Sequence, residues 1–599
     1  MSFPQRRDGF LPIGDYGLIG DGHTAALVGR DGSIDWLCWP RFDSASVFGR
    51  ILGRGGGHFR VAVAGATEAT RRYRPATAVL ETTLTAPGGQ AVLTDCLAVD
   101  GGEDGRPRSG KALVRSVRCA GGAVTVEIDF CPRPGYGAER PRMERVPSGV
   151  VAESPSGKVT LSSTAELRVD GPAARGMVEL AAGQRADLVA RRDEPPRTTD
   201  ADAVDELIDS TARWWRRWLS ASTYEGPFRD AVERSALTLK MLDYAPTGAI
   251  VAAPTTSLPE RIGGVRNWDY RYAWIRDVAF SVYALRRIGF GQEAEDFLDW
   301  TFATARCRPE ELQLMYGIEG GRDLPERVLD HLEGYRGSAP VRVGNAAAGQ
   351  LQLDSVGELL DCLHQREAGD AEMTPSMWQC IRAHVDWLAE HWERPDHGIW
   401  EVRSSPQRFT YSAAMAHVAF DRAVRAAERN GLAGASVRRW REERDRSVGV
   451  VTRDAWSEEL GAFAQTVGGS EPDASALALP LRRVVDAEDP RMRSTVKVVR
   501  ERLGAGNGLL YRYLGGDGLP GHQGAFLICS FWLVDCLAGQ GDLDEAGHLY
   551  EGLLGRANDL GLLSEEVDPG TGEALGNFPQ AFSHIGVIAS AVNLARARR

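Results

Sequence analysis

The sequence lacks an uninterrupted apolar run long enough to cross a membrane as a helix, and its opening residues, MSFPQRRDGFLPIGDYG, contain no apolar segment typical of a secretory signal. It also lacks an excess of positive charge, since 82 acidic and 70 basic residues give a formal charge of -12. Phosphate backbones and anionic membranes attract basic surfaces, so this balance argues against nucleic acid or a membrane as the main partner. We expect a cytoplasmic protein that acts on a small neutral molecule.

Cysteine pairs and metal-binding patterns are also missing. The nine cysteines form no C-x-x-C pair and no cysteine–histidine spacing typical of a metal site. An odd number of scattered cysteines is typical of reduced core residues rather than of a disulfide framework. We predict no metal site and no cofactor, and the sequence carries no signal for an oligomeric state.

Three common catalytic signatures are absent: G-x-x-x-x-G-K-[ST], H-E-x-x-H and G-x-S-x-G. The glycine-rich run GDYGLIGDGH at 14–23 does not give the G-x-G-x-x-G order that opens a dinucleotide-binding helix. We interpret this run as a turn rather than as a nucleotide loop.

Short runs of valine, threonine, alanine and leucine, separated by glycine, proline and aspartate, occupy the chain up to about residue 200. Examples are GGHFRVAVAG, TAVLETTLTAPGG, GGAVTVEIDFCPRPG and GMVELAAGQRADLVARR. Such runs with turn residues between them are typical of antiparallel strands. We predict an N-terminal β-sandwich domain over residues 1–200.

The pattern becomes helical from Asp202 onward. The segment DAVDELIDSTARWWRRWL has helical spacing and three tryptophans, and we predict a helical linker over 201–227. The region 228–599 is long enough for about twelve helices with connections of usual length. A closed (α/α)6 barrel and an open solenoid both fit that number, but no clear sequence repeat supports a solenoid. We predict the barrel.

The stretch NWDYRYAWIRD at 267–277 holds four aromatic rings, two aspartates and two arginines. Aromatic faces can stack on the C–H faces of a sugar ring, while aspartate and arginine side chains bind its hydroxyl groups. The composition of this stretch is therefore that of a sugar pocket.

Two groups of carboxylates lie in turn-rich segments that follow helical patterns. PDHGIWEVR places Glu401 beside Trp400, and GLLSEEVDPGTGEALGNFPQ holds Glu565 and Glu566. Hydrolysis of a glycoside needs one protonated carboxyl group for the leaving oxygen and one ionised group that activates water. Burial against a tryptophan raises a carboxyl pKa and favours the acid form. The alternative, from composition alone, is an amphipathic loop in which a surface glutamate follows a buried tryptophan.

Several segments, in order along nearly the whole chain, resemble glycoside hydrolase family 15, the family of glucoamylases, glucodextranases and microbial trehalases. They are PIGDYGLIGDGHTAALVGRDGSIDWLCWPRFDS, APTTSLPE followed by GGVRNWDYRYAWIRD, GYRGSAPVRVGNAAAGQLQLD, GIWEVR, GAFLICSFWLV and LLSEEVDPGTGEALGNFPQAFSHIG. The resemblance implies a β-sandwich, a helical linker and an (α/α)6 barrel. It also implies inverting hydrolysis that releases glucose from the non-reducing end of an α-glucoside.

The W-x-R-D pattern of this family is matched by Trp274, Arg276 and Asp277, which the resemblance assigns to binding of the terminal glucose. Tyr270 and Trp268 are expected to line the same wall, with core packing as the alternative for each.

The general acid of the family is matched by Glu401, after Trp400, and the general base by Glu565, the first of the pair in LLSEEVD. Glu566 is then a neighbour of the base. Inversion needs room for a water molecule, so the two carboxyl groups of such a pair lie roughly 6.5 to 9.5 Å apart.

Two further segments bear on substrate choice. GYRGSAPVRVGN resembles the family segment on the leaving-group side, which makes Tyr335, Arg336 and Arg342 candidates for substrate contacts, with a structural role as the alternative. Bacterial relatives usually carry E-G-[AT]-F before CSFW, whereas this chain has Gln523 at the first position. An amide cannot ionise, so this exchange either alters substrate preference or lowers the rate.

We predict an inverting, exo-acting α-glucoside hydrolase that takes trehalose or a short α-glucan. One alternative is a carbohydrate-binding or regulatory protein that kept the fold and lost the chemistry. Another is a biosynthetic enzyme that acts on a modified glycoside with the same acid and base.

Overall fold

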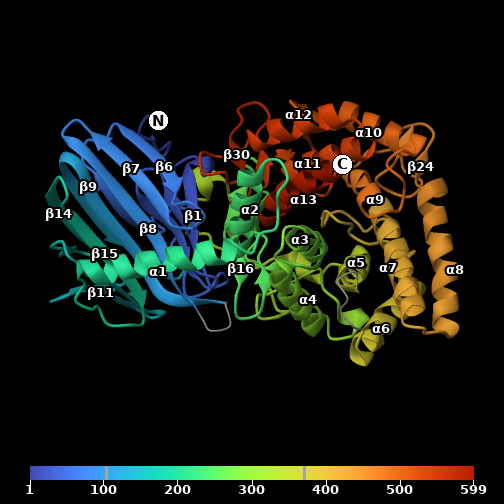
Figure 1. Cartoon of the computed structure of the whole chain (residues 1–599), viewed down its shortest axis with the longest axis horizontal. Helices are drawn as coiled ribbons and strands as arrows, with labels where there is room; N and C mark the ends of the chain where they lie inside the picture. Colours follow the sequence, from blue (N-terminus) through green and yellow to red (C-terminus); the bar gives the residue numbers. More distant parts are fainter. Residues whose placement is uncertain (102–105, 368–372, 599) are drawn as a thin grey trace.

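The computed structural model describes residues 1–101, 106–367 and 373–598. A β-sheet region formed by the N-terminal part of the chain lies beside a helical region formed by the rest (Figure 1). This division agrees with the change of sequence pattern near residue 200.

Antiparallel strands joined in one hydrogen-bonded network make up the β-sheet region. They are β1 Tyr16–Gly20, β2 Ala25–Gly29, β3 Ser33–Cys38, β4 Ser46–Phe48, β5 His58–Val63, β6 Glu68–Tyr73, β7 Leu80–Ala86, β8 Gly89–Gly101, β9 Pro107–Cys131, β10 Arg142–Val146, β11 Gly149–Ser154, β12 Gly157–Ser163, β13 Arg168–Asp170, β14 Ala173–Ala181 and β15 Arg185–Arg192. The four strand-like runs of the sequence fall on β5, β7, β9, β14 and β15, so those predictions are confirmed. The run at 14–23, predicted as a turn, is different: half of it is strand β1, and a bend follows at Gly22, which has φ +77°.

Strand β9 belongs to both halves of the network. Its first part pairs with β8 and β15, and its last part pairs with β5 and β14. A register shift opposite Gln90 and Ala91 separates the two parts. A bulge of this kind bends a strand and increases its twist, which allows one strand to serve both halves.

Helix α1 (Ala201–Leu219) lies along the sheet (Figure 1). Asp200 caps its N-terminus by accepting a hydrogen bond from the backbone N–H of Ala203. Its apolar face, which includes Val204 and Ile208, packs in one cluster with residues of β8 and β9. The helix that was predicted as a linker therefore packs on the sheet and contributes side chains to its core.

The helical region contains twelve further α-helices among the described residues. They are α2 Arg229–Met241, α3 Ile275–Arg287, α4 Gly291–Ala305, α5 Asp354–Glu367, α6 Pro375–His391, α7 Thr410–Arg429, α8 Ala435–Gly449, α9 Ala478–Leu481, α10 Pro490–Arg502, α11 Leu527–Gly539, α12 Leu543–Leu554 and α13 Ala581–Ala597.

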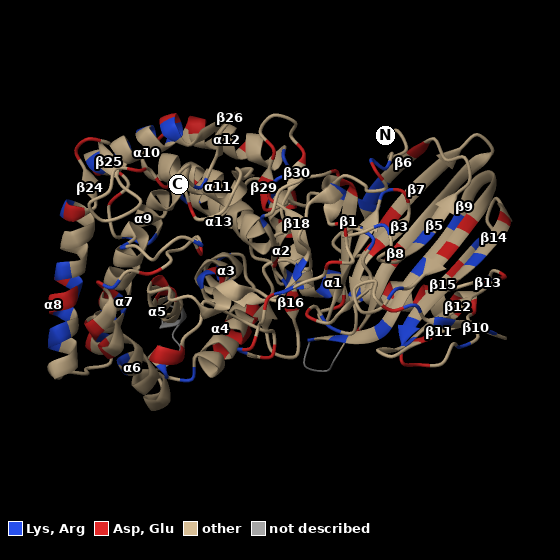
Figure 2. Cartoon of the chain, turned by 180° about the vertical axis from the view of Figure 1, so that it is seen from behind, with Lys and Arg blue, Asp and Glu red and all other residues tan. Residues whose placement is uncertain are grey.

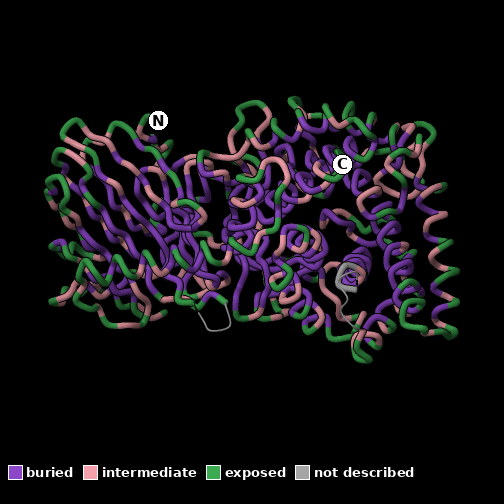
Figure 3. The backbone as a smooth tube through the Cα atoms, in the orientation of Figure 1, coloured by how far each residue is buried: buried purple, intermediate pink, exposed green. Residues whose placement is uncertain are grey.

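The most buried helices of this region contact one another in a cyclic order. Helix α3 packs on α5, α5 on α7, α11 on α13 and α13 on α3, while the 3₁₀ turn η6 (Ala474–Leu477) lies between α7 and α11. Helices α2 and α8 each pack against one member of this order, α13 and α7, whereas α4 and α12 each pack against two. Figure 3 shows the result, with buried backbone inside and exposed turns around it.

Local sequence explains where these helices are buried. Helix α11 reads LICSFWLVDCLAG and is buried almost throughout, as expected for a helix that is apolar on all sides. Helix α8 is rich in arginine and glutamate, and Figure 2 shows these charges along its length at the edge of the molecule. No helix in the described ranges is both long and apolar enough to span a membrane.

All nine cysteines are free thiols. Seven are buried, as predicted for core residues, whereas Cys131 is half-buried and Cys307 is exposed.

The two regions are joined by hydrogen bonds between buried groups. The indole Nε1 of Trp36 donates to the carbonyl oxygen of Pro254 at 2.7 Å, and the Tyr335 hydroxyl donates to that of Leu11 at 2.9 Å. The amide of Asn558 donates to backbone oxygens at the start of β1. The β-sheet region thus supports segments that lead into the helical core.

Candidate active site

A cavity with an empty volume of about 500 Å³ lies where the connections that precede the inner helices meet. It is lined by Glu260, Arg266, Trp268, Tyr270, Trp274, Arg276, Met315, Asn345, Ala347, Trp400, Glu401, Val402, Arg403, Arg512, Tyr513, Asp517 and Leu519. Loops at one end of a rigid scaffold are a usual place for binding and catalytic residues.

The aromatic stretch at 267–277 divides between this cavity and the core. Trp268, Tyr270 and Trp274 line the cavity, and the last two rings meet edge to face with centroids 5.3 Å apart. Asp269 and Arg271 instead form a fully buried ion pair, and Arg271 also donates to the carbonyl oxygen of Ser44 in the β-sheet region. Some residues of this stretch therefore line the cavity, whereas Asp269 and Arg271 connect the stretch to the β-sheet region.

Trp268 is held on three sides. The guanidinium groups of Arg342 and Arg403 each lie 4.8 Å from the centre of a Trp268 ring, and its Nε1 donates to Glu260 Oε1 at 3.0 Å. Arg403 lines the cavity, whereas Arg342 does not and donates to the carbonyl oxygen of Val265 at 2.8 Å. Arg342 thus contacts the tryptophan that lines the cavity.

Glu401 contacts the arginine at the start of α3. Arg276 donates to Glu401 Oε1 and to Asp277 Oδ1, each at 2.9 Å, and so joins two predicted site residues. Burial raises the pKa of Glu401, although Arg276 acts in the opposite direction. Glu401 also has φ +50°, a backbone conformation that non-glycine residues adopt at a cost and that is common at functional sites. Asp277 is buried and is not among the residues that line the cavity.

Trp400 is fixed beneath this loop. Its Nε1 donates to Asp473 Oδ1 at 2.9 Å, and its ring meets Phe526 edge to face at 5.6 Å. It lines the cavity beside Glu401, so it keeps an apolar surface next to that carboxyl group.

Glu565 is buried and its Oε1 accepts a hydrogen bond of 2.6 Å from the Tyr270 hydroxyl. Burial, together with the nearby charge of Glu260, raises its pKa to about 8. A Cβ atom on Gly576 would lie 2.5 Å from Glu565 Oε2, and Gly576 has φ +72°. Only glycine leaves room for this carboxyl group there.

Glu566 begins strand β29 (Glu566–Val567) and has a different set of partners from Glu565. Its Oε2 accepts a hydrogen bond of 2.7 Å from the backbone N–H of Gly524, and its Oε1 lies 3.4 Å from Arg512. Burial and the charge of Glu260 raise its pKa well above the usual range. The contact with Tyr270 therefore connects Glu565, rather than Glu566, to the aromatic wall of the cavity.

Sequence reasoning missed two buried residues that link these groups. Arg512 donates to Glu260 Oε2 at 3.0 Å, and its Nε donates to the side-chain amide oxygen Oε1 of Gln523 at 2.8 Å. Glu260 ends the segment APTTSLPE, so the family-like segment contained a signal for it. Arg512 stands in YRYLGG, where nothing in the sequence marks it.

Asp354, at the start of α5, was also missed. It is fully buried, and neither carboxyl oxygen has a hydrogen-bond partner among the described residues. Burial and the neighbouring carboxylates, Asp396 first, raise its pKa well above the usual range. Asp354 is not among the residues that line the cavity, but its carboxyl group is buried near Glu401 and Arg276.

Two candidates lie away from the cavity. The Tyr335 hydroxyl bonds to the backbone of Leu11, and its ring packs edge to face on Phe10 at 5.5 Å. Arg336 forms an ion pair of 3.0 Å with Glu573. Both contacts are structural in this conformation.

The arrangement supplies carboxyl groups in unequal environments. Burial raises the pKa values of Glu401, Glu565 and Glu566, although Arg276 and Arg512 act in the opposite direction. Such a site can donate a proton at one position and accept one at another. Within the described ranges, no group of three or more histidine, cysteine, aspartate or glutamate side chains is arranged to hold a metal ion.

Two family models match the chain. Residues 226–592 match the model of glycosyl hydrolases family 15, and residues 8–181 match the model of the trehalase-like N-terminal domain.

Individual proteins are similar over almost the full length. A trehalase of Mycolicibacterium smegmatis is 38% identical, with 99% of this chain and 93% of the relative aligned, and a trehalase of Thermoplasma volcanium is 36% identical, with 98% and 94% aligned. A crystal structure of a bacterial glucoamylase complexed with acarbose has a TM-score of 0.73 at 14% identity, over 99% of this chain and 96% of the other. That likeness concerns the fold.

Proposed function

The chain belongs to glycosyl hydrolases family 15, and from this premise we propose that it hydrolyses trehalose with inversion at the attacked anomeric carbon. It is a glycoside hydrolase of the glucoamylase and trehalase type. Similarity to trehalases along nearly the whole chain supports trehalose over a short α-glucan as the substrate.

We propose the following architecture for this enzyme: a β-sandwich over 1–200, a helical linker over 201–227 and an (α/α)6 barrel over 228–599. The cyclic packing of α3, α5, α7, η6, α11 and α13, each with helices outside it, supports the barrel. The shared strand β9 supports a sandwich whose two sheets are continuous.

The observation that carries the proposed chemistry is that Glu401 and Glu565 reach the same aromatic wall from two distant segments. Arg276 contacts Glu401, and Tyr270, six residues earlier, contacts Glu565. In the proposed reaction Glu401 protonates the glycosidic oxygen, and Glu565 removes a proton from the water that attacks the anomeric carbon.

Neighbouring groups influence the protonation states of Glu401 and Glu565. Burial beside Trp400 favours the protonated form of Glu401. The Tyr270 hydroxyl donates to Glu565 and so favours its ionised form, against the burial and the Glu260 charge that raise its pKa to about 8. Glu566 supports the same region through Arg512. Trp268, Trp274 and Arg276 are proposed to bind the sugar.

Trehalose offers a clean test because both of its anomeric carbons have the α configuration. Inversion at one of them releases one β-glucose and one α-glucose, whereas retention releases two α-glucose molecules. Proton NMR in the first minutes, before mutarotation, should show the two anomers in equal amounts. Starch, maltose, isomaltose and kojibiose should release glucose more slowly. No glucose from any of the five would support the carbohydrate-binding alternative.

A further inference from the structure

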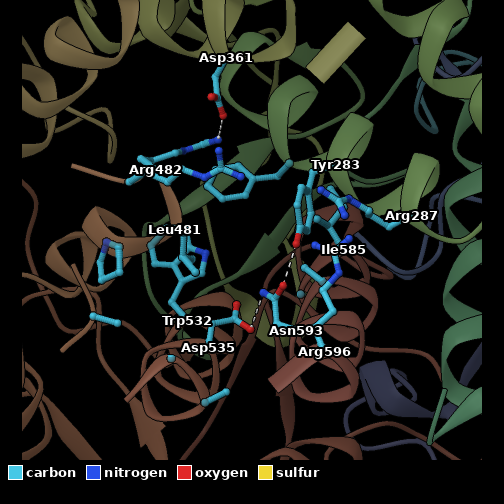
Figure 4. A pocket seen from close by; sticks show the side chains of 18 of the residues that line it. Tyr283, Arg287, Asp361, Leu481, Arg482, Trp532, Asp535, Ile585, Asn593 and Arg596 are labelled. Atoms are coloured by element: carbon cyan, nitrogen blue, oxygen red, sulfur yellow. Dashed lines mark hydrogen bonds and ion pairs between the residues drawn. The ribbon is translucent and has the colours of Figure 1, made fainter. Parts of the chain in front are cut away.

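A second cavity, with an empty volume of about 1500 Å³, lies at the other end of the inner helices (Figure 4). Helix α3 reaches the first cavity with Arg276 and the second with Tyr283 and Arg287. At 1.5 Å per residue, Arg276 and Arg287 are about 16 Å apart along the helix axis. The mouth of the second cavity at Arg287 is therefore remote from the proposed active site, and the residues that line the two cavities are different.

The inner wall of this cavity is apolar and aromatic. The rings of Phe280 and Trp532 stack with centroids 5.8 Å apart, and Leu481, Ile528 and Ile585 also line the wall. On its other side Trp532 packs on Trp400, at 5.9 Å between centroids. This pair of tryptophans separates the two cavities.

The mouth of the cavity is positively charged. Arg287, Arg483 and Arg596 are exposed and line it, and none of them has a carboxylate partner in the part of the chain that the structure describes. The Arg287 guanidinium lies 5.1 Å from the centre of the Tyr283 ring. Charges at the ends of helices stabilise the helix dipole, but that role does not require three of them around one apolar cavity.

The deeper arginines are paired with carboxylates within the protein. Arg482 and Arg422 each bond to Asp361 at 2.9 Å. Asp535 accepts a hydrogen bond of 3.0 Å from the amide of Asn593, as Figure 4 shows. The excess positive charge is therefore confined to the mouth.

We propose that this cavity binds an organic anion with an apolar body, such as an aromatic or aliphatic carboxylate or sulfonate. The anionic group lies between the arginines at the mouth, and the apolar part packs on Phe280 and Trp532. This proposal does not depend on the identity of the sugar substrate.

The test uses two fluorescent probes that differ mainly in charge. 8-Anilinonaphthalene-1-sulfonate carries a sulfonate on an aromatic body, and N-phenyl-1-naphthylamine has a similar body without it. Fluorescence titrations of the folded full-length protein should give one sulfonate site per chain. The double variant Arg287→Gln/Arg596→Gln should weaken binding of the sulfonate about tenfold, which is ~1.4 kcal/mol, and leave the neutral probe nearly unchanged. Arg502→Gln, at an exposed arginine outside this cavity, is the matched charge control.

A blocking variant tests the location independently. Ala589 lines the cavity on α13 and is half-buried, so Ala589→Trp should fill part of the space and abolish binding of both probes, with circular dichroism as the check on folding. The proposal is wrong if the arginine variants bind the sulfonate as the wild type does. It is also wrong if trehalose displaces the probe competitively, because the probe would then occupy the active site.

Discussion

A single guanidinium, that of Arg512, explains the unusual residue at 523. It contacts Glu260, lies 3.4 Å from Glu566 and donates to the Gln523 amide oxygen. Two of these three neighbours are buried carboxyl groups that share one positive charge. An amide at position 523 accepts the remaining hydrogen bond without adding a third negative charge.

Gln523→Glu should therefore raise the carboxyl pKa values around Arg512. Because the base must be ionised, we expect the acidic limb of the pH profile of kcat/KM to move to higher pH. We also expect the ratio of the rates on trehalose and maltose to change more than a few-fold. Gln523→Met, which adds no charge, should leave the acidic limb near its wild-type position. Proportional changes on every substrate with an unmoved profile would contradict this role.

Removal of either proposed catalytic carboxyl group should lower kcat by about 10²- to 10⁴-fold, because each acts in proton transfer. Glu401→Gln and Glu565→Gln nearly preserve shape, so the melting temperature should not fall. Glu459→Gln, at an exposed position, should retain full activity. A fully active Glu565→Gln enzyme beside an inactive Glu566→Gln enzyme would transfer the role of base to Glu566.

The buried Glu565 also predicts a pH-dependent stability. Its pKa is raised to about 8 in the folded state from the ordinary value of 4.5, so the folded protein keeps a proton that the unfolded chain releases. The free energy of unfolding from this group falls as pH rises through that window, by up to ~1.4 kcal/mol per pH unit. Urea unfolding at pH 5, 6.5 and 8 should show Glu565→Gln gaining stability relative to the wild type as pH rises. A difference that is constant with pH would contradict the raised pKa.

At the scale of elements, a short hairpin positions both glutamates. Strand β29 pairs with β28 (Ala525–Phe526) and with β30 (Ala574–Leu575), and Gly576 follows directly. The hairpin thus holds Glu565 and Glu566 between two backbone segments that approach closely.

Gly576→Ala should damage the site, because its Cβ would collide with Glu565 Oε2. Gly572→Ala is a matched control from the same hairpin: it has φ +76° and nothing within 4 Å of its Cβ position, so it carries the backbone strain alone. We expect kcat to fall at least tenfold more for Gly576→Ala than for Gly572→Ala, with both variants destabilised by about 1 kcal/mol or more. Equal kinetic effects in the two variants would show that Gly576 acts only through backbone strain.

The sequence predicted elements better than it predicted contacts. Helix α6 shows why: Ile381, Val385 and Leu388 recur with helical spacing and are buried. The strands were predicted equally well, because the alternation of side chains and the turn residues that bound each strand are local features of the sequence. Arg512 and Asp354 were not predicted, since Arg512 contacts Glu260, more than two hundred residues away, and Asp354 is buried without a hydrogen-bond partner in the described part of the chain. For the same reason, Asp269 and Arg271 could not be separated by sequence from the cavity-lining half of their stretch.

At the scale of the whole molecule, Asn558 joins the β-sheet region to the segment that leads to Glu565. Its Nδ2 donates to the carbonyl oxygens of Gly14 and Tyr16 at 3.0 and 2.8 Å, and its Oδ1 accepts from the backbone N–H groups of Leu560 and Leu562 at 2.9 and 3.0 Å. One side chain thus makes four hydrogen bonds, two of them across this boundary and two within its own segment.

Asn558→Ala should therefore affect both stability and catalysis. Loss of these bonds should lower the free energy of unfolding by about 2–4 kcal/mol, because four backbone groups lose their partner. We also expect a lower kcat, since the segment before Glu565 loses its anchor. Asn430→Ala, which removes one hydrogen bond at an exposed helix end, should change neither by more than a small amount. Normal kcat in a destabilised Asn558→Ala enzyme would limit this residue to a structural role.

The hydrogen bonds from Trp36, Tyr335 and Asn558 across the boundary limit how the gene can change by truncation or recombination. A truncated gene that begins near the helical region would leave Pro254 and the segment before Glu565 without the partners that the sheet provides. Recombination that exchanges the N-terminal half for a distant relative's would have to carry matching boundary residues with it. We therefore expect the two halves of this chain to be inherited together, and chimaeras joined near residue 226 to express poorly unless both sides of the boundary come from one parent.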